Sequence, residues 1–121
     1  MNSKVINNKI YSMSKSKFRS SFHLNNKMKK YVLEHGINKI EEHTYDIVSR
    51  RLKVLKENDG KQTPMKQVHP VFIAQHATAT CCRGCIEKWH HIPKNKELNN
   101  KDIDFLVTLI ITWIKKECNI K

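Results

Sequence analysis

Three of the four cysteines, Cys81, Cys82 and Cys85, lie within five consecutive positions, and histidines flank them on both sides. Thiolate sulfur and imidazole nitrogen are the ligands that zinc prefers, and four of them complete a tetrahedral structural site. The C-x2-C pair of Cys82 and Cys85 lets two sulfurs approach one ion from a turn or a helix start. The block at residues 69–93 therefore predicts a metal centre, and zinc is the expected ion.

More side chains in this block can bind a metal than one ion needs. In order of preference, the expected ligands are Cys82, Cys85, His90, His76 and Cys81. His69 and His91 are spare candidates. An iron–sulfur cluster is a less economical alternative, because its fourth ligand would have to come from Cys118 or from a histidine.

The spacing of these ligands requires a bend in the chain. On one unbroken helix, with about 100° between residues, His76 and Cys82 would point roughly 120° apart and could not share an ion. Cys82 and Cys85 differ by only about 60°, so they are compatible on a helix. We therefore expect two short helices, near 71–77 and 82–90, joined by a bend at residues 78–80.

Thiol chemistry without a metal is an alternative interpretation of the same block. A cysteine near a helix N-terminus and beside Arg83 tends to be thiolate-like and nucleophilic, so Cys82 or Cys85 could serve a thiol-dependent enzyme. A thioredoxin-like oxidoreductase would place its C-x2-C pair after a strand of a parallel sheet, and the sequence shows no such pattern. Buried cysteines can also be plain core residues.

Whether the chain is an enzyme depends on the number of protein ligands. If protein side chains fill all four positions, the site is structural and the chain is a binding module, with nucleic acid as one candidate partner. If they fill three, a metal-bound water could act as a hydrolytic nucleophile. The sequence does not decide between these cases.

The formal net charge of +12 is concentrated near the N-terminus, where residues 1–35 carry eight basic side chains and a single acidic one, Glu34. A basic surface attracts polyanions in a salt-dependent manner, which keeps a nucleic-acid partner open. The basic residues are mostly lysine, and Asn and Ile are abundant too. An AT-rich genome produces that composition without functional selection, so the charge alone does not define a function.

Targeting signals and membrane spans are not expected. The longest apolar stretch, from Phe105 to Ile114, is interrupted by two threonines and is shorter than the roughly 20 residues that cross a bilayer. The N-terminus has no continuous apolar segment of a secretory signal. Crowded cysteines without an export signal favour a reducing compartment, so we expect a cytoplasmic protein without membrane contact.

The expected fold is a single all-α domain of four or five helices. With 121 residues, the chain has room for one modest core, and its three Gly and three Pro leave few turn signals. Residues 1–15, rich in Asn, Lys and Ser and without periodicity, are expected to be a flexible basic tail, and residues 16–121 to form the domain. A short extended segment at Val71–Ile73 is an alternative to a helix there.

Caps and breaks place the other helices. Asn25 or Asn26 is expected to cap a helix that ends at His35 before Gly36. A longer helix runs from residue 37 to about residue 57, and the loop 58–64 follows it. Asn99 or Asn100 caps the last helix, whose apolar residues between 103 and 114 recur at helical spacing.

The short block before the first of these helices is expected to dock on the core. Phe18, Phe22 and Leu24 are its apolar members, and Arg19 between them is expected to face solvent or an anion.

The run HPVFIAQHATATCCRGCIEKWHHIP at 69–93, with FRSSF and DGKQTPM upstream, resembles a family of small, mostly bacterial proteins known as domain of unknown function 4186. The resemblance covers roughly residues 16–117. It implies a compact stand-alone domain and a bacterial or bacterially derived source, and it implies no activity.

Two positions depart from the pattern of that family. The family usually has a basic residue, Gly, His and Pro after Pro-Met, whereas this chain has Lys66-Gln67-Val68-His69, one residue longer and without the glycine. The family tends to have Trp-His-Gly-Ile-Pro, and here His91 replaces the glycine. By this comparison His91 is dispensable and His90 is the better ligand candidate.

Overall fold

The longest helix, α7 (Asn100–Glu117), lies at the centre of the fold. The computed structural model describes residues 3–53 and 67–120, and in it α7 contacts α1, α3 and α5. Asn99 caps the helix as expected: its side chain accepts the Asp102 N–H at 2.8 Å, and the Asp102 carboxylate accepts the Asn99 N–H at 3.1 Å. The apolar stripe predicted between Ile103 and Ile114 is buried along the helix.

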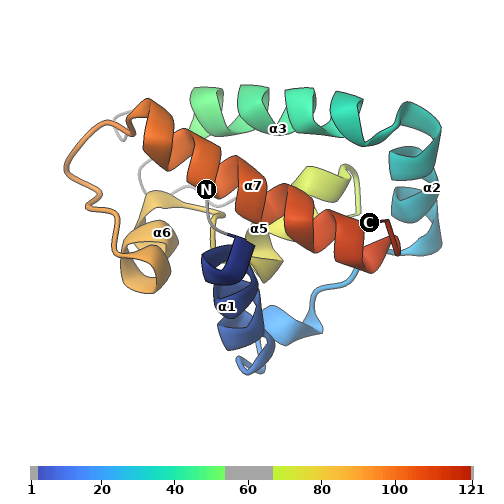
Figure 1. Cartoon of the computed structure of the whole chain (residues 1–121), viewed down its shortest axis with the longest axis horizontal. Helices are drawn as coiled ribbons and strands as arrows, with labels where there is room; N and C mark the ends of the chain where they lie inside the picture. Colours follow the sequence, from blue (N-terminus) through green and yellow to red (C-terminus); the bar gives the residue numbers. More distant parts are fainter. Residues whose placement is uncertain (1–2, 54–66, 121) are drawn as a thin grey trace.

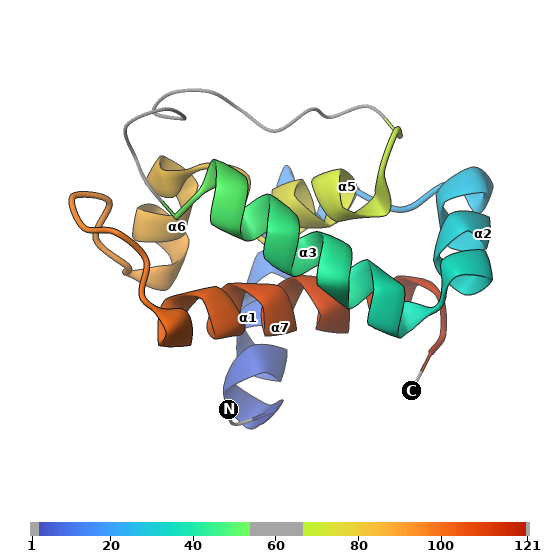
Figure 2. The ribbon, with the colours of Figure 1, turned by 90° about the horizontal axis from the view of Figure 1, so that it is seen from above.

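Helix α3 (Ile37–Arg51) runs antiparallel to α7, and the two lie side by side in both views (Figures 1 and 2). Helix α5 (Pro70–Ala77) packs against both of them, and α2 (Asn26–His35) contacts α3 and α5. The core between these helices is aliphatic, with fully buried Val32, Ile40 and Val48 facing Leu106 and Ile110. The result is one compact helical domain.

The predicted caps of α2 are confirmed, and α3 is shorter than expected. Asn25 accepts the Met28 N–H at 2.9 Å, and Gly36 follows the helix with a φ of 82°. That positive φ suits a residue without a Cβ. Helix α3 ends at Arg51 rather than near residue 57, and the loop expected at 58–64 falls outside the described residues.

The N-terminal segment is ordered, in contrast to the flexible tail expected for residues 1–15. Residues Ser3–Ser14 form helix α1, which packs against α7, and Ile6 and Met13 are buried in a small second cluster with Ala79 and Leu109. The sequence did not predict this helix, because its composition is mostly Asn, Lys and Ser and only a few of its residues are apolar. Of these apolar residues, Ile6 and Met13 pack in the cluster with Leu109 of α7, and their burial holds the helix in place.

Six α-helices and one 3₁₀ turn, η1 (Arg19–Ser21), make up the described part of the chain, which contains no strand. The all-α class is confirmed, while the expected four or five helices were too few. The option of an extended segment at Val71–Ile73 was wrong, because these residues lie inside α5. None of the described helices is long and apolar enough to cross a membrane.

The bend predicted between α5 and α6 (Arg83–His90) is present. Ala79 adopts a left-handed φ of 57°, which reverses the chain between the two helices. After α6, His91 has a φ of 60° and a ψ of 31°. Glycine adopts this left-handed conformation most readily, in agreement with the glycine that the resemblance led us to expect at this position.

The sequence suggested that Arg83 stabilises a nearby thiolate. In the structure, Arg83 instead binds the backbone of two loops near α6. Its guanidinium is 3% exposed and donates to four backbone carbonyls, those of Leu52, Lys53, Pro93 and Lys96, at 2.7 to 3.3 Å. The end of α3 and the loop that leads into α7 are thereby tied to the start of α6.

Candidate metal centre

The sulfur atoms of Cys81, Cys82 and Cys85 lie within 4.8 Å of one another, and we call these three residues the cysteine group. Cys81 is buried, while Cys82 and Cys85 are partly exposed, so the group is accessible from one side. All three cysteines are free thiols. Cys118, at the end of α7, packs against the main core instead.

Hydrogen bonds within the turn between α5 and α6 hold the cysteine group together. The Thr80 N–H donates to the Gln75 carbonyl at 2.8 Å, and the Gln75 side chain donates back to the Thr80 carbonyl at 3.1 Å. The Thr78 hydroxyl lies 3.0 Å from that of Thr80. These buried contacts stabilise the reversal of the chain at Ala79. As a result, Cys81 lies next to the start of α6.

Cys82 is the N-cap of α6, and its sulfur accepts the Cys85 N–H at 3.4 Å. The N-terminus of a helix carries partial positive charge from its unpaired N–H groups. This position therefore stabilises a thiolate, or a thiolate bound to a cation, at the start of α6.

Arg19 is the functional residue whose role the sequence did not show. It is 7% exposed rather than facing solvent, and its guanidinium donates to Cys81 Sγ at 3.6 Å and to Cys85 Sγ at 3.2 Å. A third bond, at 2.7 Å, goes to the His76 carbonyl. Arg19 comes from η1, so the segment before α2 closes over the cysteine group.

These contacts shift the pKa values of the Cys81 and Cys85 thiols in opposite directions. The hydrogen bond from Cys85 and the nearby Arg19 guanidinium lower the pKa of Cys81 to about 7, although burial opposes the shift. The same contact with Cys81, together with burial, raises the pKa of Cys85. Cys81 is thus the more acidic thiol of the pair, and its thiolate form is the one that Arg19 and the Cys85 thiol stabilise.

The two histidines expected as ligands are buried close to this block but are not members of the cysteine group. The His90 Nε2 lies 2.8 Å from the Thr78 carbonyl, and because a carbonyl only accepts, this nitrogen carries the proton. Its Nδ1 is buried with no hydrogen-bond partner among the residues described. The His76 ring stacks on Phe22, with 5.2 Å between ring centroids. Burial lowers the pKa of His90 to about 4, so the ring is neutral.

The spare candidates His69 and His91 lie apart from the sulfurs. His91 is exposed after the end of α6. His69 is the N-cap of α5, accepts the Val71 N–H through Nδ1 at 3.1 Å and places its Nε2 3.3 Å from His43 Nδ1. The structure therefore brings three of the expected ligands together, Cys81, Cys82 and Cys85, and adds Arg19.

Fold and site define the class of this protein as a small all-helical domain with a thiol centre held between its N-terminal segment and its central helices. The model of the family known as domain of unknown function (DUF4186) matches residues 7–115. Since that match covers nearly the whole chain, the protein belongs to this family. No solved structure matches the chain.

Proposed function

We propose that the protein binds a metal ion, zinc, through Cys81, Cys82 and Cys85. The observation that carries the proposal is the mutual approach of the three sulfur atoms to within 4.8 Å. Three sulfurs bound to one zinc ion at about 2.3 Å each in tetrahedral geometry lie roughly 4 Å apart. Only small adjustments of the side chains separate the observed arrangement from such a site.

The charges around the sulfurs support the same proposal. Three thiolates on a divalent ion leave one net negative charge, and the buried Arg19 guanidinium supplies one positive charge next to two of the sulfurs. Hydrogen bonds from Arg19 and from the Cys85 N–H would orient the ligand sulfurs, as outer partners commonly do in metal sites.

His90 is the candidate for a fourth ligand. Histidines that bind metals usually donate the other ring N–H to a carbonyl or carboxylate, and the contact of His90 Nε2 with the Thr78 carbonyl has that form. This leaves the lone pair of the buried Nδ1 for an ion. If His90 does not bind, a water or a substrate atom would complete the coordination, and the site would then be suited to polarising it.

A second candidate function is thiol chemistry without a metal, and the contact of Arg19 with two sulfurs favours it. A guanidinium beside a thiol stabilises the thiolate, which is the nucleophilic form. The lowered pKa of Cys81 favours Cys81 for this role, whereas the sequence alone suggested Cys82 or Cys85, and the pKa of Cys85 is raised. Cys81 is only 3% exposed, so the partly exposed Cys85 is the more accessible of the two.

Metal analysis of the protein purified without an affinity tag tests the first proposal. We expect about one zinc per chain, and a coordination spectrum with three sulfur ligands and one nitrogen or oxygen ligand. Serine substitutions at Cys81, Cys82 and Cys85 should each remove most of the metal. The matched control is Cys118→Ser, which changes the same atom outside the cysteine group and should keep the metal content of the wild type.

Alkylation separates the two candidates. Zinc-bound thiolates react slowly with iodoacetamide until a chelator removes the ion, whereas a free activated thiol reacts rapidly from the start. Less than about a tenth of an equivalent of metal, together with rapid alkylation at Cys81 or Cys85, would exclude the metal centre and leave the thiol function.

A further inference from the structure

A pocket of about 220 Å³ opens between α1, η1, the end of α5 and the C-terminal part of α7. Arg19 forms part of its wall, so this side chain lies between the pocket and the cysteine group. At roughly 30 Å³ for each water molecule, the pocket has room for about seven waters or for a small organic molecule.

The wall of the pocket is mostly apolar. Its apolar members are Ile10 and Met13 of α1, Phe22 directly after η1, Ala77 of α5 and Trp113 of α7. Ligand sites of small molecules typically combine such walls with a few convergent polar groups. Here the buried polar group is the Arg19 guanidinium.

Arg19 has donors left for a ligand. A guanidinium carries five N–H donors, and the described residues accept from Nη1 twice and from Nη2 once. The two sulfurs span the Nη1 and Nη2 end of the group, and the donors that remain are the Nε–H and the second Nη2–H. This pair forms the edge that binds a carboxylate in a two-pronged geometry.

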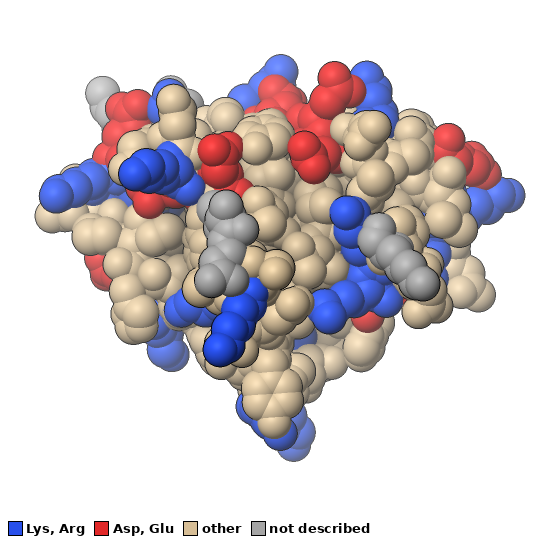
Figure 3. Space-filling model, viewed as in Figure 1, with Lys and Arg blue, Asp and Glu red and all other residues tan. Residues whose placement is uncertain are grey.

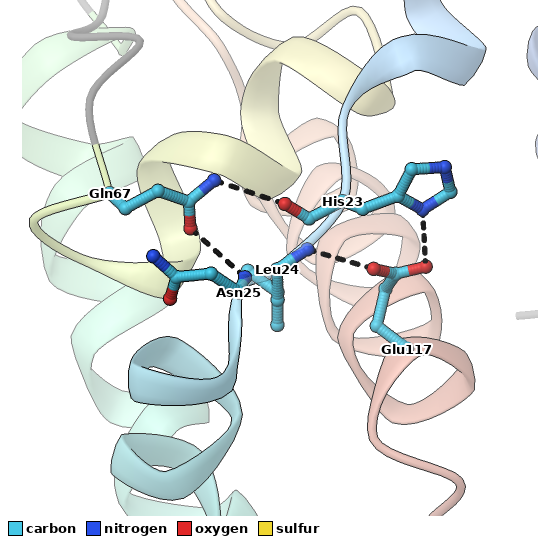
Figure 4. A network of polar contacts seen from close by, with 5 residues as sticks. All are labelled: His23, Leu24, Asn25, Gln67 and Glu117. Atoms are coloured by element: carbon cyan, nitrogen blue, oxygen red, sulfur yellow. Dashed lines mark hydrogen bonds and ion pairs between the residues drawn. The ribbon is translucent and has the colours of Figure 1, made fainter.

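The acidic side chain of the pocket, Glu117, is engaged elsewhere. One carboxylate oxygen accepts the Leu24 N–H at 2.8 Å, and the other lies 3.1 Å from His23 Nδ1 (Figure 4). Gln67 binds the segment between η1 and α2 as well. Its side chain donates to the His23 carbonyl at 3.0 Å and accepts the Asn25 N–H at 3.3 Å. Glu117 therefore ties the segment after η1 to α7 and does not neutralise Arg19.

We propose that this pocket binds a small organic carboxylate, whose anionic group pairs with Arg19 and whose apolar part packs against Phe22, Met13 and Trp113. The exposed Lys116 at the rim adds a second positive charge. An apolar wall with one buried guanidinium matches a monocarboxylate better than inorganic phosphate, which has no apolar part. The pocket needs only the free edge of Arg19, so the proposal does not depend on a metal in the cysteine group.

Titration with benzoate, followed through the indole N–H signal of Trp113 in the NMR spectrum, tests the proposal. A Trp89→Phe variant assigns the signal, because the chain has only two tryptophans. We expect saturable binding of benzoate in the millimolar range or tighter, and at least about tenfold weaker binding of benzamide, which has the same shape without the charge. Equal binding of benzoate and benzamide, no saturable shift, or tighter binding of inorganic phosphate would overturn the proposal.

Two variants locate the binding group. Arg19→Gln should weaken benzoate binding at least about tenfold. Because this variant also removes contacts to the cysteine group, Lys116→Glu provides a test at an exposed position and should weaken binding several-fold. Lys101→Glu is the matched control, since it makes the same charge change at the other end of α7 and should bind benzoate like the wild type. A Lys116→Glu variant indistinguishable from this control would contradict the placement of the anion.

Discussion

At the scale of single residues, the arginine that contacts the thiols is Arg19 and not Arg83, which the sequence had suggested. Arg83 follows the first C-x2-C cysteine directly, yet it donates only to backbone carbonyls. Arg19 bonds sulfurs that lie 62 and 66 positions further along the chain. The types and spacing of the cysteines predicted where a centre lies, but a contact over such a distance depends on how α1, η1 and α5 pack.

Replacing Arg83 should destabilise the fold without touching the sulfurs. Arg83→Gln leaves buried carbonyls without donors, and we expect the free energy of unfolding to fall by about 3 kcal/mol. Urea denaturation followed by circular dichroism measures the change. Arg50→Gln is the comparison, because Arg50 is 77% exposed and its ion pair with Asp46 should contribute less than about 1 kcal/mol.

His91 is a residue whose replacement should raise stability. Its left-handed backbone strains a residue with a Cβ, so His91→Gly should increase the free energy of unfolding by about 1 kcal/mol. Thermal denaturation compares this variant with His91→Ala, which keeps the Cβ and should show no such gain. A decrease for His91→Gly would mean that the imidazole makes a stabilising contact that outweighs the strain.

At the scale of secondary structure, the sequence located helix ends well where an asparagine caps the start or a glycine marks the end. Asn25, Asn99 and Gly36 each stand where they were expected, because capping is a local interaction. Helix α1 was missed for the opposite reason. Its few buried side chains gain from contact with α7 and the Ala79 turn, which lie far away in the sequence. The turn itself was predicted, but Cys81 was the last of the five expected ligands, and its place in the cysteine group follows from the reversal of the chain at Ala79.

The burial of Ile6 provides a test of whether α1 belongs to the domain. Ile6 is 2% exposed and Val5 is 46% exposed, although they are neighbours on the same helix. Ile6→Ala should lower the free energy of unfolding by about 2 to 4 kcal/mol, whereas Val5→Ala should change it by less than about 0.5 kcal/mol. Equal, small effects in urea denaturation would show that α1 is detached in solution.

At the scale of the whole molecule, charge is distributed unevenly. On the face shown in Figure 3, acidic side chains lie mostly in the upper half, over α3, and lysine and arginine side chains predominate around α1 below. The sequence indicated a basic segment at residues 1–35, and its first 15 residues were expected to be a flexible tail. Because α1 is packed on α7, deleting residues 1–15 would remove core contacts along with the charge. Neutralising exposed lysines such as Lys15 and Lys17 is therefore the sounder way to measure salt-dependent binding of a polyanion.

Stability should depend on pH through His69. Burial and the neighbouring His43 and His35 lower the pKa of His69 to about 4, against an ordinary value of 6.5. Between these pH values the unfolded chain binds more protons than the folded one, so the free energy of unfolding falls as pH decreases from 6.5 to 4 and levels off below. Protonation of His69 at Nδ1 would also remove the lone pair that accepts the Val71 N–H, so the hydrogen bond that caps α5 would be lost.

Denaturation at a series of pH values tests this dependence. His69→Asn retains a side chain that can cap α5 but does not titrate, so the variant should lose less stability than the wild type between pH 6.5 and 4. His91→Asn serves as the control, because His91 is exposed and is not one of the histidines that lower the pKa of His69. Identical slopes for the wild type and His69→Asn would show that His69 does not control the acid sensitivity.

The position of α7 has a consequence for how the chain is made. The helices that α7 contacts, α1, α3 and α5, all precede it in the sequence, and each of them packs most extensively against α7. On a ribosome, the core cannot close until residues 100–117 have left the exit tunnel. Until then, apolar surface and three thiols stay open to solvent and to oxidants. Nascent chains stalled before residue 100 should therefore be sensitive to protease, and chains in which α7 has left the tunnel should be protected.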